Sequence, residues 1–427
     1  MPIRKWVIYF ITAFCFICNN VLSQPVNSVK KLLYPALVEQ FYTLNNQQVF
    51  WFTSSASSAE IRDRFLQVID SAKYFGLDRE KYHYSEMRDG IVPKDAAELM
   101  TLDKLFTDMV IAFCKDVYQG GDIQKWIRND EVSVKYAVSD DDYLLDKIVY
   151  IRSVTELDSM LARIEPVEKE YAILKEELKK QITAGDKRKT EELVSTVNLY
   201  RWIYHFRFDK FIVVNIPSAT LRYYEQGVMK LQMSVVVGKP STRSPRFSTW
   251  CNEVILYPYW NVPRSIAVKE LLPRFKKNPA SIETMDMQVI GSNDQVIDYR
   301  SINWSKYNRN NFPYSFRQCT GCDNSLGVIK FNLTDPFSVY MHDTNYKLAF
   351  LSKTRYFSHG CIRVEKPIEL GNYLLNSLDS SYLKACLKDQ NPVTITLKQR
   401  VPVFVVYIPA EAPADTVKFY KDIYKLF

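Results

Sequence analysis

The sequence predicts a multidomain α+β protein, in which a helical N-terminal part precedes a mainly-β C-terminal part. The length of 427 residues exceeds one ordinary hydrophobic core and suits two or three domains. Apolar residues recur with helical periodicity up to about residue 181, and they alternate with polar residues after about residue 208. With 47% hydrophobic and 24% charged residues, the composition is that of a globular protein, which excludes a chain that is disordered throughout.

The N-terminus predicts a secretory signal peptide. Two basic residues precede an apolar run, Trp6–Ile17, which is too short to span a bilayer comfortably and has the length of a signal's hydrophobic region. Val21 and Ser23 fit the small-residue rule for cleavage. We expect residues 1–23 to be removed and the mature chain to be exported to the periplasm or cell envelope. The alternative is an uncleaved signal, which would be the chain's only membrane contact.

Helical periodicity predicts a scaffold domain over residues 24–205. Two helix faces stand out: one combines Leu102, Leu105, Phe106, Met109, Val110 and Phe113, and the other combines Val167, Tyr171, Leu174 and Leu178. The polar segment Thr183–Glu192 contains Gly185 and is predicted to be a loop.

Strand periodicity predicts a β-rich domain over residues 206–427. An apolar β-branched run, Phe211–Ile216, precedes two alternating segments around the turn Gln226-Gly227. Later strand signals are Val328–Phe331, Ser338–Met341, Val393–Leu397 and Val401–Ile408. Residues 264–330 are rich in Asn, Pro, Arg and Ser and hold fewer strand signals, so we expect a lid or insertion there.

The charge balance restricts the partners of the chain. With 56 Lys and Arg against 48 Asp and Glu, the formal net charge is +8. This mild excess permits contact with an anionic polymer such as a cell wall. No basic block or stripe stands out, so no nucleic-acid partner is expected.

The residue types that perform covalent chemistry gather in one short segment. Only four histidines occur in the chain, and His342 and His359 both lie close to Cys361. A cysteine thiol has a pKa of about 8.5 in water and needs an adjacent imidazole to become an efficient nucleophile. Gly360 would let the backbone turn tightly and present amide N–H groups to a developing oxyanion. The segment therefore predicts nucleophilic catalysis by a cysteine–histidine pair.

The same segment carries a family resemblance. The run Ser358-His-Gly-Cys-Ile-Arg363, with His342 nineteen residues before Cys361, resembles the signature of L,D-transpeptidases of the YkuD type. Further segments resemble the large YcbB-type branch of that family: Ser234–Pro240, Tyr257–Ile266, Asn324–Phe331 and Tyr340–Thr344, together with Trp51, Ala72–Asp78 and Tyr82 for its helical scaffold. The resemblance implies that residues 206–427 form a YkuD-like catalytic domain, and it covers most of the mature chain.

The resemblance also implies the roles of individual residues. Cys361 is expected to be the nucleophile and His342 the base that takes its proton. Tyr340 is expected to assist the oxyanion site or to contact substrate, while His359 and Gly360 belong to the loop that shapes the environment of the thiolate. The residues expected to bind substrate or support its cleft are Ser358, Trp260, Asn261 and Arg363. Two roles stay open for the last of these: it binds a carboxylate of the stem peptide, or it braces the loop.

Cysteine usage departs from the family pattern. Cys319 and Cys322 form a Cys-x-x-Cys pair where relatives have Pro-Gly, and a local disulfide between them is the first expectation for an exported protein. A zinc site completed by His342 and His359, a redox switch and two unpaired thiols are the alternatives. Cys251 and Cys386 are expected to be buried small residues or to form a long-range bridge, and Cys114 to be a core residue.

The reaction implied by the resemblance needs no cofactor or metal. An exported cysteine acyltransferase would form 3→3 peptidoglycan cross-links from a donor tetrapeptide and an acceptor amine, through a Cys361 thioester and with release of D-Ala. Carbapenems are expected to acylate the same thiol, and wall-synthesis proteins are further candidate partners. About twenty-five residues follow Gln181 before the β-rich domain, so the peptidoglycan-binding module of many relatives is expected to be missing.

Other functions stay open on the sequence alone. The same site would also suit an L,D-carboxypeptidase or the attachment of a protein to the wall. From other classes, the alternatives are a zinc-stabilised exported wall-binding protein and a papain-type peptidase. The order of His342 before Cys361, so few residues apart, argues against the peptidase.

Overall fold

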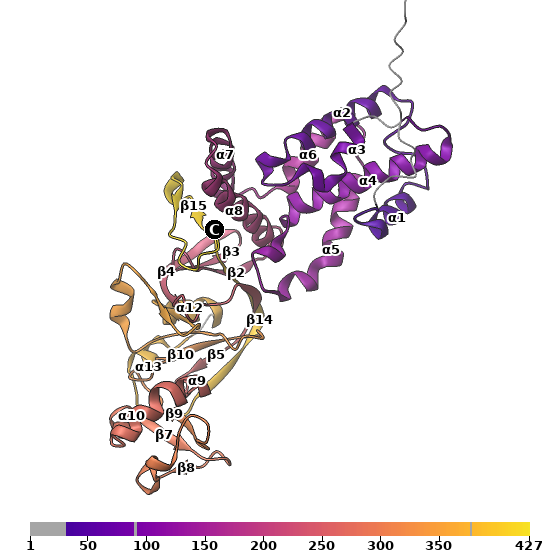
Figure 1. Ribbon diagram of the computed structural model, residues 1–427. Helices are drawn as coiled ribbons and strands as arrows, with labels where there is room; N and C mark the ends of the chain where they lie inside the picture. Colours follow the sequence, from indigo (N-terminus) through magenta and orange to yellow (C-terminus); the bar gives the residue numbers. More distant parts are fainter. Residues whose placement is uncertain (1–30, 89–91, 376–377) are drawn as a thin grey trace, which may run out of the picture.

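The computed structural model describes residues 31–88, 92–375 and 378–427 and places a helical region beside a β-sheet region (Figure 1). The predicted signal peptide, residues 1–23, lies outside the described residues. Within the part of the chain that is described, no helix combines the length and the apolar character that crossing a membrane requires. The described part of the chain begins with the helical region.

In the helical region, α1 to α6 share one apolar core around α4, whereas α7 and α8 contribute to a second core shared with the sheet. The helices of this region are α1 (Pro35–Leu44), α2 (Ala56–Asp70), α3 (Tyr84–Arg88), α4 (Ala96–Gln119), α5 (Glu131–Ile148), α6 (Val154–Ile164), α7 (Lys169–Ala184) and α8 (Lys187–Tyr204). All six residues of the first predicted face lie on α4 and are buried. The second predicted face lies on α7, except that Val167 precedes the helix and is 89% exposed.

The predicted loop Thr183–Glu192 is wrong, because only a tight turn separates α7 from α8. Gly185 ends α7 in the left-handed region at φ +74°, which glycine adopts without strain. Asp186 then caps α8 by accepting a hydrogen bond from the backbone N–H of Lys189. The polar residues that suggested a loop form the first turns of α8.

The β-sheet region is a sheet that closes on itself. Its strands are β1 (Asn129–Asp130), β2 (Lys210–Asn215), β3 (Thr220–Glu225), β4 (Val228–Gly238), β5 (Phe247–Leu256), β10 (Ile329–Leu333), β11 (Met341–His342), β12 (Tyr356–Ser358), β13 (Ile362–Val364) and β14 (Val393–Val406). They are ordered β1-β5-β10-β11-β13-β4-β3-β2-β14, and β12 adds to β4. Because β14 also pairs with β5, the path returns to its second strand.

Two strand predictions need correction. The segments Val393–Leu397 and Val401–Ile408 are parts of one strand, β14, whose register shifts between Thr396 and Val401. Only Met341 of the predicted strand Ser338–Met341 is in regular pairing, within the short β11.

Helices cover both faces of the sheet. On one face α8 buries Trp202 against Phe404 of β14, with the two rings 5.2 Å apart. On the other face α12 (Pro367–Leu375) buries Leu370 in a second apolar cluster, and α13 (Ser380–Lys384) adds Leu383 to it. The sheet that carries the predicted site is therefore rigidly held between layers.

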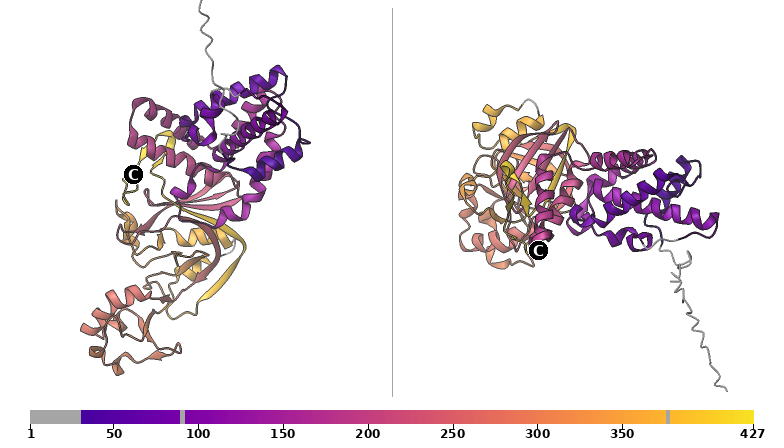
Figure 2. Two further views of the ribbon diagram at one scale, coloured as in Figure 1. Left: turned by 45° about the vertical axis from the view of Figure 1, so that its right-hand side comes forward. Right: turned by 90° about the horizontal axis from the view of Figure 1, so that it is seen from above.

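The predicted insertion is a small folded subdomain. Its elements are β6 (Trp260–Asn261), α9 (Arg264–Ile266), η5 (Ala267–Leu271), α10 (Leu272–Lys277), α11 (Ser281–Thr284), β7 (Met287–Ile290), β8 (Val296–Ile297) and β9 (Ser315–Gln318). The strands form a separate sheet in the order β6-β9-β7-β8 around a core that includes Phe275 and Phe316. This subdomain lies at the end of the molecule opposite to the helical region (Figure 2).

The helical region joins the sheet through β1. This strand pairs in parallel with β5, and Asp130 accepts a hydrogen bond of 2.6 Å from the hydroxyl of Ser248. The next residue, Glu131, accepts hydrogen bonds from the hydroxyls of Thr249 at 2.9 Å and Thr334 at 3.2 Å. Side chains of the helical region thus hold the segment of the sheet region that leads to β11.

Candidate active site

Three adjacent strands place the predicted catalytic residues on one face of the sheet. His342 in β11 lies opposite Arg363 of β13 and opposite Lys330 of β10. The carbonyl of Tyr340 accepts a hydrogen bond of 3.1 Å from the N–H of the residue that follows Cys361. Because side chains alternate between faces along a strand and opposed residues share a face, these five side chains form one cluster.

The Cys361 thiol is protonated at rest. Burial raises the pKa of the Cys361 thiol, and the backbone N–H and hydroxyl of Tyr340, followed by Lys330, act in the opposite direction. Burial also raises the pKa of the Tyr340 phenol, so the hydroxyl that faces Cys361 stays an O–H donor at neutral pH. The site therefore holds a thiol next to a neutral donor.

The His342 ring is held as a neutral base. It is 5% exposed, and burial, followed by the charge of Arg363, lowers the pKa of His342 to about 3. Its Nδ1 lies 2.5 Å from the carbonyl oxygen of Asp343, which only accepts, so Nδ1 carries the proton. Nε2 is then the nitrogen with the free lone pair, which is the form a general base needs.

Asp343 fixes the backbone that carries His342. Its carboxylate accepts hydrogen bonds from the backbone N–H groups of Thr344 at 2.7 Å and Val328 at 3.1 Å. Gly327 makes room for it: a Cβ there would stand 2.2 Å from the carboxylate oxygen, and its φ is +60°. Sequence reasoning missed this role of Asp343, although its position directly after the histidine was a usable signal.

The loop before Cys361 is braced by its own hydrogen bonds. The hydroxyl of Ser358 donates to the carbonyl of Cys361 at 2.7 Å and accepts from the N–H of Gly360 at 3.1 Å. Ser358 is 2% exposed, and in this structure its hydroxyl braces the loop. Gly360 is needed for its φ of +123°, but its N–H is already engaged and does not point at an oxyanion in this conformation.

A second network fixes the same loop from distant parts of the chain. The hydroxyl of Ser244 donates to the carbonyl of Gly360 at 2.7 Å and accepts from the N–H of Gly238 at 2.9 Å. The hydroxyl of Tyr424, close to the C-terminus, accepts from the N–H of Ser244 and donates to the carbonyl of Gly238. Neither Ser244 nor Tyr424 carried a sequence signal, because nothing local marks a contact across 180 residues.

The insertion reaches the cluster at two points. Nε2 of His359 lies 2.8 Å from a carboxylate oxygen of Glu270 in η5, so this ring points at the insertion. The indole of Trp260 faces the hydroxyl of Tyr340 and partly opposes the rise that burial causes in the pKa of that phenol. Asn261 is exposed and pairs through its backbone with Arg317 of β9. Trp260 thus joins the cluster, whereas Asn261 lies at its margin.

Arg363 presents an unpaired donor to the cluster. Burial lowers the pKa of Arg363, and the charge of Cys361 opposes this shift. Its Nε is buried and finds no hydrogen-bond partner among the described residues. A buried donor without a partner is costly unless a ligand supplies the acceptor.

The predicted disulfide between Cys319 and Cys322 is wrong. Cys322 is bonded to Cys386, 64 residues later, and Cys319 is a partly exposed free thiol. The hydroxyl of Thr320 donates to the carbonyl of Gln390 at 2.8 Å, which holds the two segments side by side and brings Cys386 to Cys322. This long-range bridge also removes Cys322 from the zinc alternative. Within the described residues, no group of three His, Cys, Asp or Glu side chains is placed to hold a metal ion.

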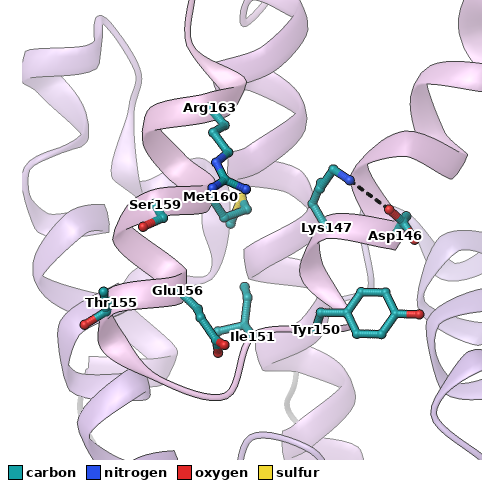
Figure 3. A pocket seen from close by; sticks show the side chains of 9 residues that line it. All are labelled: Asp146, Lys147, Tyr150, Ile151, Thr155, Glu156, Ser159, Met160 and Arg163. Atoms are coloured by element: carbon teal, nitrogen blue, oxygen red, sulfur yellow. Dashed lines mark hydrogen bonds and ion pairs between the residues drawn. The ribbon is translucent and has the colours of Figure 1, made fainter.

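Two pockets lie away from the nucleophile. One, of about 520 Å³, is lined by both bridged cysteines and by Asp343, so it lies behind the predicted base. The other, of about 340 Å³, lies between the end of α5 and α6 in the helical region (Figure 3). Its lining residues are Asp146, Lys147, Tyr150, Ile151, Thr155, Glu156, Ser159, Met160 and Arg163. None of them belongs to the predicted site.

Comparison with known proteins supports the assignment of both regions. Residues 209–401 match the family model of the L,D-transpeptidase catalytic domain, YkuD, and residues 36–178 match that of a scaffold domain. The chain is 27% identical over 408 residues to the "Putative L,D-transpeptidase" of Haemophilus influenzae, covering 92% of this chain and 78% of that one.

Solved structures of L,D-transpeptidases also match part of the chain. An L,D-transpeptidase from Mycobacterium smegmatis matches at 14% identity and a TM-score of 0.21, covering 46% of this chain and 58% of that one. L,D-transpeptidase 3 from Mycobacterium tuberculosis matches at 14% identity and a TM-score of 0.24, covering 46% of this chain and 60% of that one. The family models and the curated relative carry the conclusion: the chain is an enzyme of the L,D-transpeptidase type, in which a YkuD catalytic domain follows a scaffold domain.

Proposed function

We propose that this enzyme forms 3→3 cross-links in peptidoglycan through a thioester on Cys361. The observation that carries the proposal is the shared face on which Tyr340, His342 and Cys361 meet. The catalytic domain is that of transpeptidases, whose substrates are peptidoglycan peptides. The donor is a tetrapeptide stem, and the acceptor is the side-chain amine of the third residue of a neighbouring stem.

In acylation, a proton transfer accompanies the attack of the sulfur. Nε2 of His342 takes the thiol proton as the sulfur of Cys361 attacks the carbonyl of the third donor residue. Because Nδ1 stays bonded to the Asp343 carbonyl, the charged imidazole keeps its orientation. Protonated His342 is a strong acid in this buried place, so it readily returns the proton to the amine of the departing D-Ala.

Neutral donors stabilise the tetrahedral adduct. The Tyr340 hydroxyl faces the sulfur and keeps its proton at neutral pH, so it is positioned to donate to the oxyanion. The N–H of Cys361 is the second donor that we propose. Removing one such donor typically costs a factor of roughly 10² to 10³ in rate. Gly360 contributes its backbone conformation instead of its N–H.

Substrate recognition follows from the remaining groups. The unpaired Nε of Arg363 suits a carboxylate of the stem peptide. The insertion contacts the cluster through Trp260, and it contacts His359 in the loop before Cys361 through Glu270. These contacts support a role as a lid that excludes water from the thioester. If water enters in place of the amine, the same site becomes an L,D-carboxypeptidase, and an amine on a protein would give protein attachment.

The location and domain plan complete the proposal. A signal at residues 1–23 would export the enzyme to the cell envelope, where its substrate lies and where the Cys322–Cys386 bridge is stable. We place the domain boundary near residue 206, where α8 ends and the strands begin. The same acylation chemistry makes Cys361 a target for carbapenems.

One experiment tests the function. The purified protein without residues 1–23 is incubated with disaccharide-tetrapeptide, and the products are followed by mass. Loss of D-Ala together with a cross-linked dimer supports transpeptidation, and loss without dimer supports the carboxypeptidase. Cys361→Ala should abolish both, while Cys319→Ala, which alters the other partly exposed thiol, should leave them intact. An unchanged substrate with wild-type protein would refute both functions.

A further inference from the structure

Lys330 shares the catalytic face but has no part in the mechanism above. It lies in β10 directly opposite His342. Its Nζ stands 4.2 Å from the centroid of the Tyr340 ring, the same ring whose hydroxyl faces Cys361. The ammonium group is therefore stacked on one side of the phenol, with the nucleophile beside it.

The ammonium group of Lys330 has no carboxylate partner at close range. Among the described residues, no ion pair or hydrogen bond engages its Nζ, and Glu253 acts on it only as a more distant charge. One carboxylate oxygen of Glu253, Oε2, accepts a hydrogen bond of 3.1 Å from the side-chain amide of Asn332. Keeping a partly buried cation without an anionic partner costs folding free energy. The site therefore holds a positive charge before the negative charge of a thiolate forms near it.

We propose that Lys330 is the cation that stabilises the anionic sulfur of Cys361 at the moment when His342 takes the thiol proton. This inference rests on Cys361 being the nucleophile. No bond to Lys330 forms or breaks: the proton moves from Sγ to Nε2 of His342, and the negative charge left on sulfur is met by the ammonium. Lys330 is thus a positioning residue that acts through its charge on the reacting sulfur.

The other charges around the sulfur do not replace Lys330. Arg363 faces both Cys361 and His342, but its unpaired Nε suits substrate. Asp335 disfavours the thiolate, and Tyr340 is neutral. His342 gains its charge only as the sulfur loses its proton, so it provides no field beforehand. Of the groups that favour the anion, Lys330 is the cation without another evident task.

The test is the pH dependence of Cys361 alkylation by iodoacetamide, a small neutral reagent. Rates are read for the Cys361 peptide by mass, because Cys319 is also partly exposed. The charge-removing variants are Lys330→Met and Lys330→Gln, and Lys330→Arg restores the charge. Lys366→Met is the matched control, since Lys366 is an exposed lysine of the same domain and lies outside the cluster. Thermal unfolding shows which variants are folded.

The charge-removing variants should shift the alkylation profile upward in pH by about one unit. At pH 7 this is a roughly three- to fourfold loss of rate, since a tenfold loss of thiolate is partly offset by its greater nucleophilicity. Lys330→Arg should restore the profile, and Lys366→Met should not move it. An unchanged profile in folded variants would overturn the proposal, and a raised KM for tetrapeptide in those variants would then assign Lys330 to a substrate carboxylate. Iodoacetamide is not a peptide substrate. The shift in the pH profile of alkylation can therefore be measured even if the protein does not cross-link peptidoglycan.

Discussion

The charge state of His342 predicts how the stability of the enzyme depends on pH. The pKa of His342 is lowered from 6.5 to about 3 in the folded protein, mainly by burial. Between these values the unfolded chain binds a proton that the folded chain does not, so stability falls as pH falls. At pH 5 this single group should destabilise the fold by about 2 kcal/mol, compared with about 0.2 kcal/mol at pH 7. The figure at pH 5 changes little if the folded pKa lies anywhere below 4.

Urea unfolding at pH 7 and pH 5 measures this effect. His342→Gln removes the titrating ring, so its loss of stability between the two pH values should be about 2 kcal/mol smaller than that of the wild type. His359→Gln is the comparison variant, because it removes a ring that is 39% exposed instead of buried. Equal pH dependence in His342→Gln and wild type would show that the ring is accessible to protons in the folded state, and the neutral base would have to be abandoned.

Three further predictions follow from the disulfide, the catalytic turn and the domain junction. Replacing Cys386 by Ser opens a loop of 64 residues and should cost about 4 kcal/mol of unfolding free energy without reductant, whereas Cys319→Ser should cost little. Gly327→Ala should cut the rate of acylation at least tenfold, because the added Cβ collides with the Asp343 carboxylate that fixes the backbone of His342. The mass of the carbapenem adduct measures this rate. Gly185→Ala, at a similar φ but in open space, should not change it. Glu131→Ala should lower the unfolding free energy in urea by about 1 to 2 kcal/mol, because it removes the hydrogen bonds that the hydroxyls of Thr249 and Thr334 donate to the Glu131 carboxylate.

The grouping of the candidate residues Tyr340, His342 and Cys361 could be predicted because its signals are local. Tyr340 and His342 are two residues apart, so strand periodicity alone places them on one face. The Ser358–Arg363 run is a short turn whose glycine has the positive φ that its position suggested. The buried faces of α4 and α7 could be predicted for the same reason, because the apolar residues of each face repeat within a few helical turns.

The rest of the site depends on pairings that no local pattern encodes. The sequence around Lys330 predicts only a lysine in a strand. Its place next to His342 follows from the pairing of β10 with β11, which no local pattern predicts. The partner of Cys322 was misjudged because sequence proximity favoured Cys319, whereas tertiary packing brings Cys386 to it. The role of Tyr424 could not be predicted from the sequence for the same reason, because this residue lies close to the C-terminus and contacts Gly238 near the loop before Cys361. Predictions thus failed where sheet order or loop packing decides the neighbour.

The arrangement of charges implies when the nucleophile is activated. A preformed thiolate–imidazolium pair requires an imidazole that holds a proton at neutral pH, but burial and Arg363 oppose a charge on His342. Burial likewise favours the neutral thiol of Cys361. The resting pair is therefore uncharged, and in the mechanism that we propose the proton moves only as the sulfur attacks. An uncharged thiol in an oxidising compartment is also a poor target for oxidants, because the thiolate is the reactive form. In the mechanism that we propose, the same burial would delay the activation of Cys361 and would protect its thiol until substrate arrives.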